Sequence, residues 1–235
     1  ALKEGTKIYW VCPLVEESDL VDLAAAEERY VSLVGMFGDR VGLIHGRLKG
    51  PQKDAVMADF AEGRLDVLVN NAGTTKFVQH GDLDGLSGDD FKHIYGVNVV
   101  GPFQMVRAAR EALKASGDAS VVNVASIAGV KGVGSSIAYA ASKGALITMT
   151  QSLARVLGPE IRVNAVCPGF ITGDWLAEGM GREVYDASKA FLESKTPLQK
   201  TCTPESVAES IMSFIEGHSV VTGQHLVLDG GHLLL

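Results

Sequence analysis

Residues 65–73, "LDVLVNNAG", decide the fold class of this chain, because a short apolar run ends there in two amides and a glycine. Uninterrupted apolar runs of this length are typical of strands that are buried on both faces of a parallel sheet. In such sheets, ligands bind at the carboxyl ends of the strands. Gly73 lets another group approach the backbone closely. The stretch therefore predicts a buried parallel strand that ends at a ligand site.

Similar apolar runs alternate with helical patterns along the whole chain. The predicted strands are Ile8–Cys12, Val41–His45, Val67–Asn70, Ser120–Ala125, Arg162–Cys167 and His225–Leu228. The predicted helices are Asp22–Phe37, Gln52–Ala61, Asp89–Ala115, Ile137–Leu157 and Pro204–Glu216, the last one capped by Thr203. This alternation predicts an α/β fold: a doubly wound, Rossmann-like parallel sheet in a three-layer α/β/α arrangement. We see no linker, repeat or low-complexity tract, so we expect a single domain over residues 1–235.

Composition excludes several classes of function. The net charge of −7 and the pI of about 5.4 argue against a polyanion-binding surface, so we expect no nucleic-acid partner. Three widely spaced cysteines show no metal-binding pattern and fit a reducing compartment, so we predict no metal site. No apolar run is long enough to span a membrane, and the first residues lack the apolar core of a signal peptide. We therefore expect a soluble, cytoplasmic protein without a membrane partner.

Tyr139 and Lys143, in "AYAASKGAL" (138–146), stand four residues apart in a predicted helix and share one face of it. A lysine cation beside a phenol favours the phenolate, which lowers the tyrosine pKa and makes it a usable acid or base near neutral pH. An ordinary surface pair would have the same spacing, so the motif alone is weak.

Three further segments carry polar groups toward the same edge of the predicted sheet. Ser126 ends "SVVNVAS" (120–126), where a hydroxyl at the end of a strand can bind a substrate oxygen or cap a turn. Asn98 lies inside a predicted helix, where asparagine is unfavourable, which indicates a kink, a water site or a tolerated core amide. The segment "CPGFIT" (167–172) ends another strand in the way that "LVNNAG" does.

Taken together, these pieces closely resemble the short-chain dehydrogenase/reductase family over about residues 65–235. The resemblance rests on NNAG at 70–73, Asn98, Ser126, Tyr139-x-x-x-Lys143, Pro168-Gly169 and "TGQHLVLDGGH" at 222–232, in the family's order. It implies hydride transfer between NAD or NADP and a small-molecule carbonyl or alcohol. It also implies a homodimer or homotetramer that pairs through the helices holding Asn98 and Tyr139.

The same resemblance implies a role for each residue. Tyr139 would be the general acid/base, Lys143 would lower its pKa and hold the nicotinamide ribose, Ser126 would orient the substrate oxygen, and Asn98 would hold a relay water. The adenosine side of the cofactor would contact Asn71, Ala72 and Gly73. The nicotinamide would lie beside Pro168, Gly169, Ile171 and Thr172. Many family members have threonine where this chain has Gly173, which weakens the contact expected from Thr172.

The resemblance stops upstream of residue 65, because the family's TGxxxGIG phosphate loop is missing there. Those glycines would let a pyrophosphate lie against a helix N-terminus. Instead, residues 12–17 read CPLVEE, and two carboxylates would repel a pyrophosphate. The strand expected to read the adenine ribose ends in His45-Gly46, and only two strand–helix units precede Val67, so we expect one strand fewer than the family has.

Residues 3–69 resemble the second motor lobe of a RecG-type DNA helicase instead. The matching stretches are "YWVCPLVEESDLVDLAAAEERY" (9–30), "VGLIHGRLKGPQKDAVMADFAEG" (41–63) and "LDVLV" (65–69). The chain is thus interpreted as a chimera with a helicase-like half (1–69) and a dehydrogenase-like half (70–235). Either half can extend one parallel sheet through right-handed crossovers.

Three functions follow from this interpretation. The chain is an oxidoreductase with a complete Asn98, Ser126, Tyr139 and Lys143 set but impaired cofactor binding. Alternatively, it is a folded chimera without activity, because each lost phosphate contact costs about 1–3 kcal/mol. A nucleic-acid module using Arg47, Lys49 and Lys53 is the third reading, which the net charge disfavours.

Overall fold

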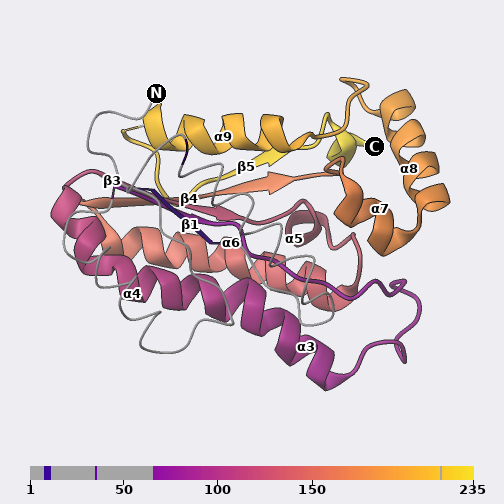
Figure 1. Ribbon diagram of the computed structural model, residues 1–235, viewed down its shortest axis with the longest axis horizontal. Coiled ribbons are helices and arrows are strands. Elements are labelled where there is room, and N and C mark those ends of the chain that lie inside the picture. The colour runs from indigo at the N-terminus through magenta and orange to yellow at the C-terminus, as the bar shows by residue number, and fades with distance from the viewer. Residues whose placement is uncertain (1–7, 12–34, 36–65, 218) are drawn as a thin grey trace.

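The computed structural model describes residues 8–11, 35, 66–217 and 219–235, and it shows a parallel sheet with helices on both faces (Figure 1). The sheet has the order β1-β2-β3-β4-β5, and each neighbouring pair is parallel. Its strands are β1 (Ile8–Val11), β2 (Val67–Asn70), β3 (Ala119–Val124), β4 (Ile161–Pro168) and β5 (His225–Leu228). The predicted parallel α/β fold is therefore confirmed.

Some predicted elements lie outside the described residues. They are the strand Val41–His45 and the helices Asp22–Phe37 and Gln52–Ala61, together with the basic residues Arg47, Lys49 and Lys53. The prediction of one strand fewer than the family depends on these residues and stays a prediction.

The central strands are buried because alternate side chains pack into two different cores. Leu68 and Val121 face helices α4 (Gly101–Ser116) and α6 (Ile137–Leu157), where they join an apolar cluster that includes Val106. Val69 and Val122 face the opposite side, where they pack against α9 (Pro204–Glu216). This two-sided burial explains why these strands appear in the sequence as uninterrupted apolar runs.

The helices confirm the strongest local signals and add elements that were not predicted. Helices α6 and α9 have the predicted bounds, and the Thr203 hydroxyl accepts a hydrogen bond from the Ser206 backbone N–H at 3.2 Å. The additional elements are α5 (Ala128–Lys131), α7 (Asp174–Met180), α8 (Arg182–Lys195) and the 3₁₀ turn η3 (His232–Leu234). Helices α7 and α8 bury only Ala177, Tyr185 and Leu192.

The predicted helix over 89–115 is three elements rather than one. It comprises α3 (Gly88–Tyr95), a π-helical turn η2 (Gly96–Val100) and α4, which follow one another directly. Asn98 lies in the π turn and is fully buried. The unfavourable asparagine thus marks a real irregularity, and π turns of this kind are frequent at functional sites.

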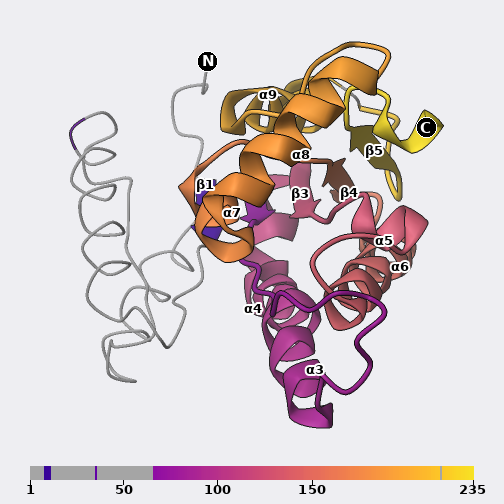
Figure 2. The same cartoon turned by 90° about the vertical axis from the view of Figure 1, so that its right-hand side faces the viewer.

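The carboxyl ends of β4 and β5 point toward α7 and α8, and the loop between β2 and α3 lies on the same side (Figures 1 and 2). Polar residues that follow the strands therefore gather at this edge of the sheet. Among the residues that the structure describes, no helix has both the length and the apolar character that a bilayer crossing demands.

Candidate functional site

Lys143 is the charged centre of the carboxyl edge. It extends from α6 and is 3% exposed, and its Nζ donates a hydrogen bond to the Val124 carbonyl oxygen at 2.8 Å. Burial lowers the pKa of Lys143 to about 8, and the Cys167 thiol partly opposes this shift. An ammonium group has three donors, and this contact uses one of them.

Gly73 leaves open the space beside this ammonium group. A Cβ at Gly73 would lie 3.3 Å from Lys143 Nζ and 3.7 Å from Asn98 Oδ1. Any side chain here would occupy the space that the remaining Nζ donors face. The glycine predicted to permit close approach therefore does so next to the predicted lysine.

The Asn98 side chain, in the π turn, forms hydrogen bonds with the loop after β2 and holds that loop in place. Its Oδ1 accepts the Thr74 N–H at 2.8 Å, and its Nδ2 donates to the Thr74 carbonyl oxygen and to Ser142 Oγ, each at 2.9 Å. Both amide donors are thus used by the protein, which leaves one lone pair on Oδ1 for a further donor. The amide therefore fixes the loop backbone, and its expected role in holding a relay water stays a prediction.

Tyr139 lies one helical turn before Lys143, and the distance from Lys143 Nζ to the centre of its ring is 5.6 Å. The phenol is half-buried. Burial raises the pKa of Tyr139 above its ordinary value, while the Ser126 side chain opposes that shift. Desolvation of the phenolate is thus the largest influence on this pKa, and the expected lowering by Lys143 stays a prediction.

Ser126 lies two residues after β3, and its side chain reaches the Tyr139 phenol. Its Oγ accepts the Ala128 N–H at 3.1 Å and approaches the Pro168 carbonyl oxygen at 3.5 Å. The hydroxyl therefore holds the turn that leads into α5, as the alternative interpretation of a turn residue predicted, and also lies beside Tyr139. The two predictions for Ser126 are compatible in this geometry.

Residues 168–172, at the end of β4 and directly after it, form another part of the carboxyl edge of the sheet. The Gly169 N–H donates to the Leu228 carbonyl oxygen at 2.7 Å, and a Cβ at Gly169 would lie 2.9 Å from the Asp229 Cβ. The N–H and the hydroxyl of Thr172 both donate to the Cys202 carbonyl oxygen, at 2.9 and 3.2 Å. Ile171 makes a parallel bridge with Cys202, so this segment is fixed on both sides.

Several supporting residues were not predicted. Ser142 is fully buried and donates to the Tyr139 carbonyl oxygen at 2.7 Å while it accepts from Asn98, so it links the two. Thr74 and Cys202 act through their backbones, which sequence types do not reveal. Only Ser142 had a usable signal, a small hydroxyl directly before the buried lysine.

The residues present fit the nicotinamide half of a dinucleotide. The open space at Gly73 exposes Lys143 donors to a ribose hydroxyl, and the Thr172 hydroxyl can still accept a bond from a carboxamide N–H. The loop containing Asn71 and Ala72 lies on the same edge, directly after β2. The segment expected to meet the pyrophosphate, 12–17, lies outside the described residues.

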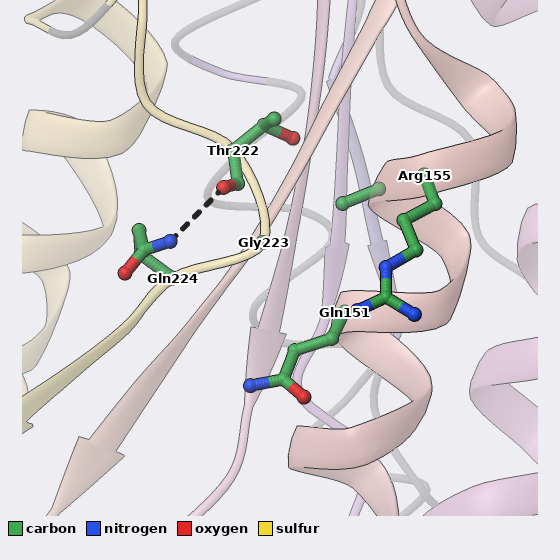
Figure 3. Close-up of a pocket in the computed structure, with 6 residues that line it drawn as sticks. Gln151, Arg155, Thr222, Gly223 and Gln224 are labelled. Atoms are coloured by element: carbon green, nitrogen blue, oxygen red, sulfur yellow. Dashed lines mark hydrogen bonds between the residues drawn. The ribbon is translucent and has the colours of Figure 1, made fainter.

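A separate pocket opens further along α6, away from this edge (Figure 3). It is lined by Gln151, Ala154, Arg155, Thr222, Gly223 and Gln224. The Thr222 hydroxyl accepts the Val163 N–H at 3.0 Å, and Gln224 Nε2 donates to the Thr222 carbonyl oxygen at 3.3 Å. None of the predicted site residues lines this pocket, so it is distinct from the candidate site.

Comparison with protein families and curated proteins gives matches over most of the chain. A family model described as enoyl-(acyl carrier protein) reductase matches residues 52–232. A protein of Streptomyces violaceoruber, named as ketoacyl reductase 2 of the granaticin polyketide synthase, is 44% identical over 173 residues, which are 73% of this chain and 68% of that protein. An uncharacterized oxidoreductase of Thermotoga maritima is 33% identical over 205 residues, 86% of this chain and 80% of that protein.

Solved structures give a similar result. A gluconate 5-dehydrogenase from Burkholderia cenocepacia, in complex with NADP and tartrate, aligns with a TM-score of 0.72 at 25% identity, over 89% of this chain and 83% of that one.

Proposed function

The chain belongs to the short-chain dehydrogenase/reductase family, and on this premise we propose that it is an NAD- or NADP-dependent oxidoreductase that interconverts a carbonyl compound and an alcohol. The observation that carries the proposal is the convergence of Tyr139, Lys143 and Gly73. A half-buried phenol, a buried ammonium group and a backbone without a side chain meet at one point of the sheet edge. Cofactor binding and proton transfer to the substrate can therefore occur next to each other.

Tyr139 is the proton donor in the reductive direction. Because burial raises its pKa, the phenol is protonated at neutral pH and can give its proton to the substrate oxygen as negative charge develops there. Ser126, which lies beside the phenol, offers a second hydrogen bond to the same oxygen. In the oxidative direction the phenol must first lose its proton, and a nearby ammonium group favours that loss.

Lys143 has two roles in this scheme. One N–H holds the Val124 carbonyl oxygen and fixes the ammonium position, while the others face the space at Gly73 and would bind ribose hydroxyls. Asn98 fixes the loop that forms this space, and its remaining lone pair would accept a bond from a relay water. The chain thereby orients the reacting groups and connects the proton donor to solvent.

The nicotinamide would supply the hydride. The backbone of Asn71, Ala72 and Gly73 would contact the adenosine side, and Pro168, Gly169, Ile171 and Thr172 would border the nicotinamide. What supports these assignments is that Thr74, directly after the first segment, and Gly169 and Thr172 in the second are held by hydrogen bonds at the carboxyl edge.

Oxidation of NADH and NADPH with a panel of carbonyl compounds tests the proposal. We expect Tyr139→Phe to lower kcat by about 100-fold or more, since it removes only the acid/base hydroxyl. Tyr95→Phe is the matched control, because Tyr95 is also half-buried but lies on α3, and it should keep full activity. Equal activity of Tyr139→Phe and the wild type would refute the assignment.

The alternative, a folded chimera without activity, predicts no cofactor affinity. Calorimetric titration with millimolar NAD and NADP separates the two, because the oxidoreductase should release heat on binding and the silent chimera should not. The helicase origin of residues 3–69 stays a prediction. The family model matches from residue 52 onward, so it overlaps the end of that segment.

We also infer a homodimer or homotetramer that forms through α4 and α6. Val100 precedes α4 directly and is 49% exposed, Phe103 on α4 is 43% exposed and Val156 on α6 is 72% exposed, and burial of such side chains would favour association. Light scattering that gives the monomer mass at micromolar concentration would refute this inference. Location in the cytoplasm stays a prediction.

A further inference from the structure

Two large aromatic side chains stand exposed at the carboxyl edge and contact each other. Phe77, in the loop after β2, is 37% exposed, and Trp175, in the first turn of α7, is 57% exposed. Their ring centres lie 6.0 Å apart, and the ring planes are inclined by 53°. Exposed apolar side chains that gather in one place can mark a binding site for an apolar ligand.

The loop that carries Phe77 is fixed next to the proton donor. The Val78 N–H donates to the Ser135 carbonyl oxygen at 2.9 Å, and the hydroxyls of Thr75 and Ser135 lie 2.7 Å apart. A Cβ added at the neighbouring Gly134 would lie only 3.7 Å from the Tyr139 ring, so this segment lies close to the phenol. Phe77, between these two anchors, therefore borders the entrance to the candidate site.

Helix α7 is shaped to receive the Phe77 ring. A Cβ at Gly179 would fall inside the van der Waals surface of that ring, so only glycine lets the ring lie on the helix backbone there. Trp175 is the second residue of this helix, close in sequence to Thr172, which is proposed to border the nicotinamide. The two rings thus connect the two loops that enclose the reacting groups.

Nearby cations are neutralised by carboxylates. Lys76, next to Phe77, makes an ion pair with Asp90 at 2.9 Å, and Arg182, after α7, lies 3.5 Å from Asp174. An anionic group on a substrate would have to compete with these carboxylates. The surroundings of the rings therefore favour a neutral ligand.

We propose that Phe77 and Trp175 form the apolar wall of the substrate site, which selects neutral carbonyl compounds that carry an alkyl or aryl group over hydrophilic or anionic ones. The inference rests on the proposed function, because the reacting carbonyl must reach Tyr139. Neither ring touches the reacting atoms, so both determine specificity rather than catalysis.

Paired kinetics with two neutral ketones, 4-phenylbutan-2-one and hydroxyacetone, test this proposal. Trp175→Ala should raise KM for 4-phenylbutan-2-one by about tenfold and leave KM for hydroxyacetone and the cofactor affinity unchanged. Gly179→Ala should do the same without removing a ring, because its new methyl displaces Phe77. Phe191→Ala is the matched control, since Phe191 is 56% exposed on α8 but belongs to no ring pair in the described part of the chain, and it should change neither KM.

A binding measurement distinguishes failure of this proposal from failure of the proposed function. Fluorescence of Trp175, obtained as the difference between the wild type and Trp175→Phe, should change on addition of 4-phenylbutan-2-one to the protein with oxidised cofactor. If that change occurs but no carbonyl is reduced, the apolar wall stands and the oxidoreductase proposal fails. If carbonyls are reduced but Trp175→Ala affects both ketones equally, or if no fluorescence change occurs, the apolar wall is refuted.

Discussion

Substitution of Asn98 by alanine should both destabilise the protein and weaken the site. The change removes three hydrogen bonds and leaves the Thr74 N–H, the Thr74 carbonyl and the Ser142 hydroxyl without this partner in a buried place. Each bond contributes about 0.5–1.5 kcal/mol net, so we expect the free energy of unfolding to fall by about 2–5 kcal/mol. Since domains have only about 5–15 kcal/mol of stability, urea denaturation should show a large shift of the midpoint.

Asn164 provides the matched control. It is also fully buried, and its side chain bonds the Val221 carbonyl oxygen and the Gln224 N–H, both at 3.0 Å, away from the candidate site. Asn164→Ala should lower the free energy of unfolding by about 1–3 kcal/mol and leave cofactor affinity unchanged. Asn98→Ala should weaken cofactor binding in calorimetry by about tenfold, because the loop holding Gly73 is released.

Two results would refute this reasoning. A loss of less than about 1 kcal/mol for Asn98→Ala would show that the loop does not depend on the amide. An equal loss of cofactor affinity in Asn98→Ala and Asn164→Ala would show that the effect is general destabilisation rather than release of the loop.

Three further predictions follow from the same edge of the sheet. The pKa of Lys143 in the folded state is lowered from 10.5 to about 8, so above pH 8 the unfolded state binds more protons than the folded state. The free energy of unfolding of the wild type should therefore rise by about 1 kcal/mol relative to that of Lys143→Met between pH 8 and 9. Chemical denaturation of both proteins at both pH values measures this difference, and an equal change in the two proteins would contradict the prediction. Because burial raises the pKa of Tyr139, one tyrosine should form phenolate later than an ordinary tyrosine in a spectrophotometric titration, and Tyr139→Phe should remove that late component. Gly169→Ala should cost about 1–3 kcal/mol in urea denaturation, because its Cβ would lie 2.9 Å from the Asp229 Cβ, whereas Gly81→Ala, which meets no atom within 4 Å, should change stability by less than about 0.5 kcal/mol.

The sequence predicted those elements whose signals are local. Helix α9 begins at Pro204 because Thr203 caps it, and the strand over 67–70 is recognisable because both of its faces are buried. Helices α7 and α8 escaped prediction because polar side chains dominate α8 and each of the two helices buries only one or two residues. Their position over the site follows from tertiary packing, such as that of Phe77 on Gly179, which the sequence pattern does not encode.

In the candidate site, too, some features could be predicted from the sequence and others depend on tertiary packing. Spacing placed Tyr139 and Lys143 on one helix face, and the order of the motifs brought Ser126, Asn98 and Gly73 to one edge. The direction of the Tyr139 pKa could not be predicted, because it depends on how much water the fold leaves around the phenol. Ser142 likewise became recognisable only when the π turn placed Asn98 beside it.

The π turn explains why stability and chemistry depend on the same residues here. A regular helix over 88–116 would advance each following residue evenly, whereas the wider π turn shifts the side chains around Asn98 relative to those of α4. That shift brings the amide against Thr74 and Ser142, and through them it fixes both the loop at Gly73 and the helix turn that carries Tyr139. Loss of the π turn would therefore separate the binding loop from the proton donor even if every proposed catalytic residue were still present.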